Sequence, residues 1–258
     1  MKIALIQTDI AWNDPVTNVG RCTTLASEAI RQGAELLIFP EMFTSGFSMP
    51  VGEMATISAE AGREFLGRTA REHSVYSVAS VPEVGPHGEL FNTAYLYRPD
   101  GTHESYRKIH LFSYGEETSR YSAGEKTLTV KIGELRCTIF ICYDLRFPLP
   151  FHQRAADTDL FIVIANWPAI RREHWITLLK ARAIENQAYV AGVNRVGEGG
   201  GLLYSGDSIL FAPDGSALNE ASSAQAIFAA EVRAERVATW RETFPAVRDR
   251  REALYRSM

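Results

Sequence analysis

The chain has 258 residues, of which 46% are hydrophobic and 22% are charged, and its formal net charge at pH 7 is −4. This composition is typical of a globular protein, and a chain of this length buries roughly three quarters of its unfolded surface without a disulfide or a metal to hold it together. The slightly acidic balance gives no support to nucleic acid or an anionic membrane as a partner.

The N-terminus is typical of a first strand rather than a targeting segment. Its apolar run ends at Gln7, Thr8 and Asp9, which makes it shorter than the roughly 7 to 15 apolar residues of a signal peptide. No run in the chain approaches the roughly 18 apolar residues of a membrane span. We therefore expect a soluble, cytoplasmic protein without a membrane partner.

In the first part of the chain, the predicted strands and helices alternate. Residues 2–8 form a strand, and residues 15–32 form a helix with one apolar face, which Asp14 caps and Gly33 ends. A short apolar run at 36–41 is typical of a buried strand. The next predicted elements are a helix near 60–73 and a strand over 75–81.

Hairpins dominate the middle of the chain. Turns at Pro99-Asp100-Gly101 and at Gly133-Glu134 each separate two runs with strand character. The predicted elements from here on are strands over 92–98, 103–108, 127–132, 135–141 and 159–166, a helix over 173–187, and strands over 188–194, 205–212 and 224–232.

No repeat or linker divides the chain, so we expect a single domain over residues 1–258. The glycine-rich segment 197–201 is too short to be a boundary and is interpreted as a mobile loop. Hairpins mixed with strand–helix–strand units predict an α/β (α+β) fold, in which helices cover the outer faces of the sheets.

The three cysteines are Cys22, Cys137 and Cys142, and this odd number argues against a disulfide framework. Cys137 and Cys142 lie about 16 Å apart on one predicted strand at roughly 3.3 Å per residue, and a disulfide needs Cα atoms within about 7 Å. Their odd spacing also places them on opposite faces. They therefore neither pair nor share a metal, and the six histidines show no metal-ligand spacing. We expect no cofactor.

Four polar residues directly follow predicted strands, namely Glu41, Lys108, Cys142 and Asn166. Sites in α/β sheets form beyond the carboxyl ends of strands, so all four are candidates for function. Each also has an ordinary structural explanation, such as an ion pair, a surface lysine, a small core thiol or a turn cap. A Cys–His pair with His110 or His152 as its base also stays open, whereas no GxSxG, Walker A or HExxH motif occurs.

Three motifs in chain order resemble the nitrilase superfamily of carbon–nitrogen hydrolases, and the resemblance extends over nearly the whole chain. In that family a Glu, a Lys and a Cys form the catalytic triad, so the resemblance implies Glu41 as base, Lys108 as oxyanion electrophile and Cys142 as nucleophile. It also implies a four-layer α-β-β-α sandwich and a homodimer or larger homo-oligomer. The motifs are FPEMF (39–43), YRKIHLF (106–112) and ICYDLRFP (141–148).

Many family members carry a second glutamate shortly after the lysine, and here Glu117 is favoured over its neighbour Glu116. The segments CYDLRFP, ANWPAIRREHW and SGDSILFAPDG look most like the omega-amidase branch, which deaminates the ω-amide of 2-oxoglutaramate and 2-oxosuccinamate. This implies a small-molecule amide substrate and a thioester on Cys142. The backbone N–H of Tyr143 would assist Lys108 at the oxyanion.

Proton transfer from thiol to carboxylate faces a gap of roughly 4 pKa units, or about 6 kcal/mol, between ordinary Cys and Glu side chains. We expect burial to raise the pKa of Glu41, and Lys108 together with a helix N-terminus to lower the pKa of Cys142.

The carboxylate of a 2-oxo acid needs a cation, and Arg146, Arg171 and Arg172 each follow a strand end. Asn166 and Trp167 are predicted to line the same pocket. Two alternatives remain open. One is another amidase of the family, including an N-carbamoyl amino acid hydrolase, and the other is a non-catalytic binding or assembly protein that keeps the fold.

Overall fold

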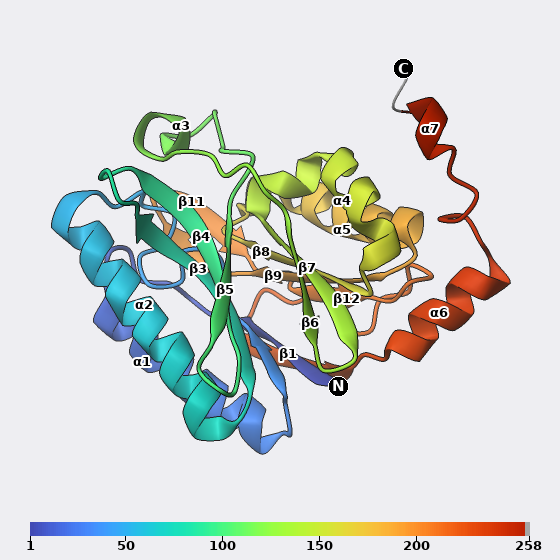
Figure 1. Cartoon of the computed structure of the whole chain (residues 1–258). Helices are drawn as coiled ribbons and strands as arrows, with labels where there is room; N and C mark the ends of the chain where they lie inside the picture. The colour runs from blue at the N-terminus through green and yellow to red at the C-terminus, as the bar shows by residue number, and fades with distance from the viewer. Residues whose placement is uncertain (256–258) are drawn as a thin grey trace.

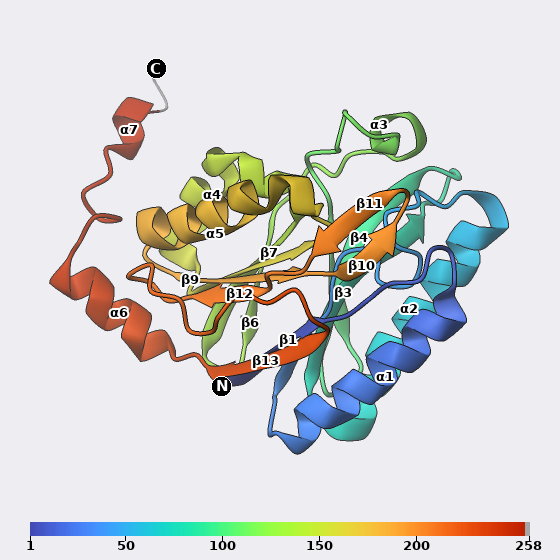
Figure 2. The same ribbon diagram turned by 180° about the vertical axis from the view of Figure 1, so that it is seen from behind.

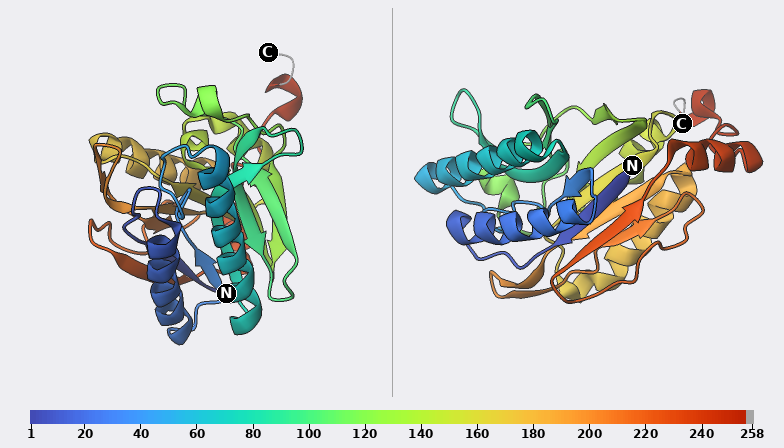
Figure 3. Two further views of the ribbon diagram at one scale, coloured as in Figure 1. Left: turned by 90° about the vertical axis from the view of Figure 1, so that its left-hand side faces the viewer. Right: turned by 90° about the horizontal axis from the view of Figure 1, so that it is seen from below.

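The computed structural model describes residues 1–255 as two β-sheets packed face to face, with helices on both outer faces (Figures 1 and 3). This arrangement confirms the predicted four-layer α-β-β-α sandwich. The first sheet has six strands, in the spatial order β13 (Ala226–Glu231), β1 (Lys2–Gln7), β2 (Leu36–Ile38), β3 (Tyr76–Val84), β4 (Leu90–Tyr97) and β5 (His103–Arg107). The second has five, in the order β12 (Ile209–Phe211), β9 (Tyr189–Asn194), β8 (Leu160–Ala165), β7 (Leu135–Ile141) and β6 (Leu128–Ile132).

Two pairs of helices form the outer layers. Helices α1 (Pro15–Arg31) and α2 (Gly52–His73) cover the first sheet, and α4 (Pro148–Arg154) and α5 (Arg172–Asn186) cover the second (Figure 2). The remaining elements are α3 (Glu117–Arg120), α6 (Ala234–Thr243), α7 (Glu252–Tyr255), three 3₁₀ helices (Cys142–Arg146, Ala155–Asp157 and Ala169–Arg171), and the hairpin of β10 (Val196–Gly199) and β11 (Leu202–Ser205). No helix within residues 1–255 is long and apolar enough to cross a membrane.

Strand β1 shows why the chain builds a sandwich. Ile3 and Leu5 belong to the core between the sheets, whereas Ala4 and Ile6 belong to the core under α1 and α2. Successive side chains of a strand point to opposite faces, so a strand covered on both faces must be apolar throughout. The unbroken apolar run at the N-terminus follows from this double burial.

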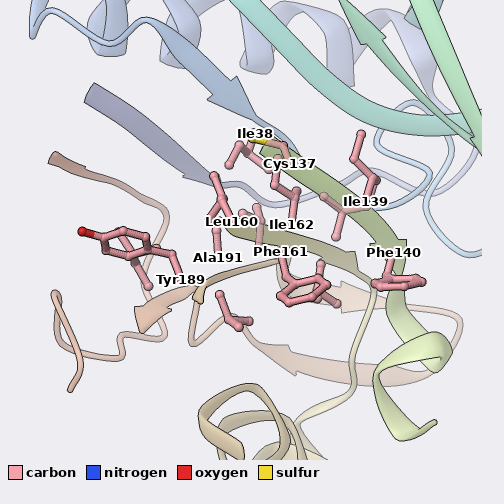
Figure 4. Close-up of a cluster of buried hydrophobic side chains, with 14 of the residues drawn as sticks. Ile38, Cys137, Ile139, Phe140, Leu160, Phe161, Ile162, Tyr189 and Ala191 are labelled. Carbon is pink, nitrogen blue, oxygen red and sulfur yellow. The ribbon is translucent and has the colours of Figure 1, made fainter. Parts of the chain in front are cut away.

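The same alternation governs β7 in the second sheet. Cys137 joins Ile38 of the first sheet in the inter-sheet core (Figure 4), whereas Phe140 packs on Phe151 of α4 with ring centroids 4.2 Å apart. Full burial of one such large apolar side chain stabilises the fold by about 1.5–3 kcal/mol. This core fixes the separation of the two sheets. It therefore also fixes the positions of the residues that follow the ends of their strands.

Most predicted elements are present, with two differences. Helix α1 has the predicted cap, since Asp14 accepts a hydrogen bond from the Thr17 N–H at 3.0 Å. Helix α2 begins at Gly52 rather than near residue 60, because its start has no side-chain cap that would mark it in the sequence. The interpretation of 197–201 as a loop is wrong: Gly200 and Gly201, both with positive φ, make the turn of the β10–β11 hairpin.

Candidate active site

The four strand-end residues gather at one edge of the sandwich. Strands β2 and β5 run in the same direction in the first sheet, and β7 and β8 are parallel in the second, so each sheet brings two carboxyl ends to this edge. The carboxylate of Glu41 accepts a hydrogen bond from the backbone N–H of Asn166 at 2.8 Å, and the carbonyl of Glu41 accepts one from the Asn166 side chain at 2.5 Å. These two bonds join the two sheets directly at the site.

Lys108 lies between two carboxylates in the closed interior of this edge. Its Nζ is 3.0 Å from Oε1 of Glu41 and 2.9 Å from Oε2 of Glu117, and all three side chains are fully buried. Burial opposes the ammonium charge, but the carboxylates of Glu117 and Glu41 outweigh it and raise the pKa of Lys108. Lys108 therefore stays protonated at any physiological pH.

Glu117 is the second glutamate that meets the lysine. Its Oε2 accepts the Phe112 N–H at 2.7 Å, and burial raises its pKa, although Lys108 opposes that rise. The neighbouring Glu116 points away, with a side chain that is 68% exposed and paired with Arg120. Of the two candidates, only Glu117 contributes to the charged cluster.

Cys142 occupies a strained turn between β7 and a 3₁₀ helix. Its φ of +45° lies in the left-handed region, which costs a non-glycine residue about 1–3 kcal/mol. The carboxylate of Asp144 accepts the Ile141 N–H at 2.9 Å and holds the turn. The N–H of Tyr143 is in the first turn of the 3₁₀ helix, where backbone donors have no acceptor within the helix.

The resting thiol of Cys142 is more protonated than the sequence predicts. Burial raises its pKa well above the ordinary value, the carboxylate of Glu41 raises it further, and Lys108 only partly opposes them. The expectation of a lowered pKa is therefore wrong, because burial and the nearby carboxylates outweigh the single ammonium group. The thiol of Cys142 donates a long hydrogen bond to the carbonyl of Asn166 at 3.9 Å.

A pocket of about 50 Å³ opens onto the thiol. Its walls include all the residues predicted to contact substrate, namely Tyr143, Arg146, Asn166, Trp167 and Arg171. Arg146 lies over the Trp167 ring at 4.8 Å, and Arg171 lies over the Phe112 ring at 5.6 Å. Arg172 does not line the pocket, because Asp207 binds its guanidinium at 2.9 and 3.0 Å. The structure thus corrects the set of three candidate arginines to two.

Sequence reasoning missed three residues of this region. Asn92 donates to Glu41 at 2.8 Å and to Glu117 at 3.1 Å, so it holds both carboxylates. Asp144 anchors the turn that carries Cys142, and Tyr204 of the hairpin lines the pocket. A signal for Asp144 was available, since a carboxylate two residues after a strand-end cysteine is suited to cap the turn, but Tyr204 was hidden by the interpretation of its hairpin as a loop.

Residues 2–242 match the model of the carbon–nitrogen hydrolase family. The chain belongs to this family. It is 39% identical to an omega-amidase, YafV, of Yersinia enterocolitica, with 96% of each chain covered, and 32% identical to a 2-oxoglutaramate amidase of Bacillus subtilis, with 98% of each covered. A solved amidase from Nesterenkonia sp. AN1, in which acrylamide has added to the active-site cysteine, is 28% identical with a TM-score of 0.87, covering 100% of this chain and 99% of that one.

The family match and the amidase relatives together make this protein an amidase, a hydrolase that acts on carbon–nitrogen bonds. Its histidines do not favour the alternative of a Cys–His pair. His110 binds Asp144 at 2.8 Å and His152 binds Glu252 at 3.0 Å. Within residues 1–255, neither histidine lines the pocket of Cys142 or bonds to its sulfur.

Proposed function

We propose that this protein releases ammonia from the ω-amide of 2-oxo dicarboxylic acid monoamides, with 2-oxoglutaramate and 2-oxosuccinamate as substrates, through a thioester on Cys142. The observation that carries the proposal is a thiol that lines a small pocket with two arginines in its wall and that lies within the electrostatic influence of a buried carboxylate–ammonium pair 3.0 Å apart. The similarity to an omega-amidase and to a 2-oxoglutaramate amidase supports the choice of substrate.

In the first half of the reaction, the sulfur of Cys142 forms a bond to the amide carbon as its proton moves to Glu41. The carbonyl oxygen becomes an oxyanion, which the N–H of Tyr143 and the positive charge of the Lys108 ammonium stabilise. The intermediate then collapses: the carbon–nitrogen bond breaks, Glu41 returns its proton to the nitrogen, and ammonia leaves. The acyl group remains on Cys142 as a thioester.

In the second half, Glu41 takes a proton from water as the water oxygen bonds to the thioester carbon. The carbon–sulfur bond breaks, the sulfur regains its proton from Glu41, and the new carboxylic acid leaves and gives its remaining proton to solvent as a 2-oxo dicarboxylate. Throughout the cycle Lys108 keeps its charge. Glu117 balances that charge, so that Glu41 is not the sole partner of Lys108 and is free to accept and return a proton.

The pocket wall supplies the recognition of the substrate carboxylate in this proposal. Arg146 and Arg171 both line the pocket and are the cations available to bind a carboxylate in a bidentate manner. Arg171→Ala and Arg146→Ala are each expected to weaken binding of 2-oxoglutaramate, whereas Arg172→Ala, which removes the partner of Asp207, serves as the matched control.

The deciding experiment measures ammonia release from a panel of 2-oxoglutaramate, 2-oxosuccinamate, N-carbamoyl amino acids, nitriles and simple aliphatic amides. We expect the two 2-oxo acid amides to have the highest kcat/KM of the panel. We also expect the mass of the peptide that carries Cys142 to increase by that of the acyl group when the reaction is quenched early. Turnover of N-carbamoyl compounds without turnover of 2-oxoglutaramate would reject the substrate. Absence of any acyl adduct under single-turnover conditions would reject the thioester.

A further inference from the structure

Tyr204 is buried and lines the same pocket as the thiol of Cys142, and its hydroxyl forms no hydrogen bond with the described part of the chain. It lies on β11, is 6% exposed, and lines the pocket with Cys142 and Arg171. Among the described residues, this hydroxyl is not one of the fully enclosed unpaired polar atoms, so it is accessible from the pocket that Tyr204 lines. An unpaired donor that faces a pocket from an otherwise buried side chain points to a ligand.

The tyrosine ring rests on a rigid support. The guanidinium of Arg195 stacks on it at 4.4 Å and is itself fully buried. Arg195 donates to the carbonyls of Val196 at 3.1 Å and Glu198 at 2.9 Å, and to the carboxylate of Asp9 at 3.2 Å. These bonds tie the support to β10 and to the end of β1, so the ring is held in place before any substrate arrives.

The glycine-rich hairpin allows this close approach. A Cβ at Gly199 would fall 2.7 Å from both Nη1 of Arg195 and the ring of Trp12. Real Cβ atoms do not come so near to other heavy atoms, so only glycine lets the hairpin lie flat on the arginine. The glycine run is thus part of what positions Tyr204.

The charges around the hydroxyl define what it can bind. Burial raises the pKa of Tyr204 to about 12, Arg195 opposes this, Cys142 and Glu41 add to it, and Arg171 opposes it. The phenol is therefore a neutral hydrogen-bond donor in the working enzyme. It lies within the electrostatic influence of Cys142, Glu41 and Arg171.

We infer that Tyr204 is a specificity-determining residue that donates a hydrogen bond to an acceptor oxygen of the acyl chain, the 2-oxo or carboxylate oxygen beyond the scissile amide. This rests on the proposed function and deepens it. With the amide carbon at Sγ of Cys142 and the carboxylate at Arg171, a short substrate places those oxygens along the wall that Tyr204 forms. Plain aliphatic amides offer no acceptor there.

The test compares Tyr204→Phe with the wild type on 2-oxoglutaramate and on butanamide, which lacks both acceptor oxygens. The phenylalanine ring keeps the stack on Arg195. We expect the ratio of the two kcat/KM values, 2-oxoglutaramate over butanamide, to fall by about 10- to 100-fold, as for loss of a hydrogen bond to a charged or strongly polar group. Tyr189→Phe, which alters a buried tyrosine outside this pocket, is the matched control and should leave the ratio unchanged.

An unchanged ratio in Tyr204→Phe overturns the inference, whether both activities stay or both fall, because a merely structural role affects the two substrates equally. A thermal unfolding midpoint within a few degrees of the wild type shows that the variant is folded. If the wild type does not turn over 2-oxoglutaramate, the proposed function fails on its own. Succinamate, which carries a terminal carboxylate where butanamide has a methyl group, then replaces 2-oxoglutaramate in the ratio. A lower succinamate-to-butanamide ratio in Tyr204→Phe supports the inference, and an unchanged ratio overturns it.

Discussion

Ile38 and Glu41 are three residues apart and both are fully buried, yet their surroundings in the protein interior are opposite in character. Ile38 packs in the apolar core between the sheets, and Glu41 lies in a cluster of charges. Ile139 of β7 and Cys142, which directly follows that strand, repeat the same contrast. At the end of each strand, three residues separate a side chain of the apolar core from one of the charged cluster or its neighbouring thiol.

The two interiors differ in their contribution to stability. Burial of apolar surface contributes about 25 cal/mol per Å². Buried charges lose the free energy of hydration, and their mutual attraction offsets that loss only in part. The raised pKa values of Cys142 and Glu117 reflect this loss, and the left-handed φ of Cys142 adds strain. The core therefore holds in place a site that is unfavourable by itself.

The strongest test of this contrast is Glu41→Gln, which keeps the volume of the side chain and removes its charge. We expect kcat for ammonia release to fall by about 10²- to 10⁴-fold, because the proposed base is lost, while the protein stays folded, because Glu117 still pairs with Lys108. Glu83→Gln, on the same sheet but paired with Arg107 at 2.6 Å, is the control and should keep its activity. Near-normal turnover in Glu41→Gln would end the assignment of the base.

The opposite substitution is Ile162→Ala in the core between the sheets, where Ile162 is fully buried. It is expected to lower the free energy of unfolding in urea by about 2–5 kcal/mol, from lost burial and a residual cavity. The kcat of the protein that remains folded should stay within about threefold of the wild type. A loss of kcat as large as that of Glu41→Gln would show that the core and the site are not separable.

The convergence of Glu41, Lys108, Cys142 and Asn166 was predictable because it depends on strand direction, and strand direction follows from short-range patterns in the chain. The choice between Arg171 and Arg172 was not predictable. Both are arginines after the same strand, and only the position of a distant carboxylate decides which guanidinium stays free.

The protonation of Cys142 was mispredicted for a similar reason. The sequence identifies the charged groups near the thiol, but the sign of the shift depends on distances and on complete burial, which belong to the folded state. Tyr204 was missed because glycines at 199–201 suggest a loop by composition, whereas their backbone angles form a hairpin turn. Properties set by local pattern were therefore recoverable, and those set by a balance of contacts were not.

A smaller effect is expected from Asn92→Ala, which leaves all charges in place and removes the amide that bridges Glu41 and Glu117. With the carboxylates less firmly placed, kcat should fall by about 10- to 100-fold while KM changes little, because the amide does not line the substrate pocket. Steady-state kinetics on one amide substrate measure both constants. A change confined to KM would contradict a positioning role.

The smallest effect concerns the thiol itself and separates its resting state from its reactive one. A thiol of pKa 9.0 is only about 1% ionised at pH 7, and the raised pKa of Cys142 lowers that fraction further. Without substrate, its alkylation by iodoacetamide should therefore rise about tenfold per pH unit through pH 9, without a plateau. Peptide mapping distinguishes it from Cys22, whose burial raises its pKa to about 12.

In Glu41→Gln the two measurements should move in opposite directions. Removal of the carboxylate removes a charge that raises the pKa of Cys142, so alkylation at a given pH should become a few-fold faster while turnover collapses. A pre-formed thiolate would instead give a plateau below pH 8 in the wild type and no acceleration in the variant. Faster alkylation with lost turnover means that the charged interior keeps the thiol protonated at rest, and that Glu41 takes its proton only as the amide carbon arrives.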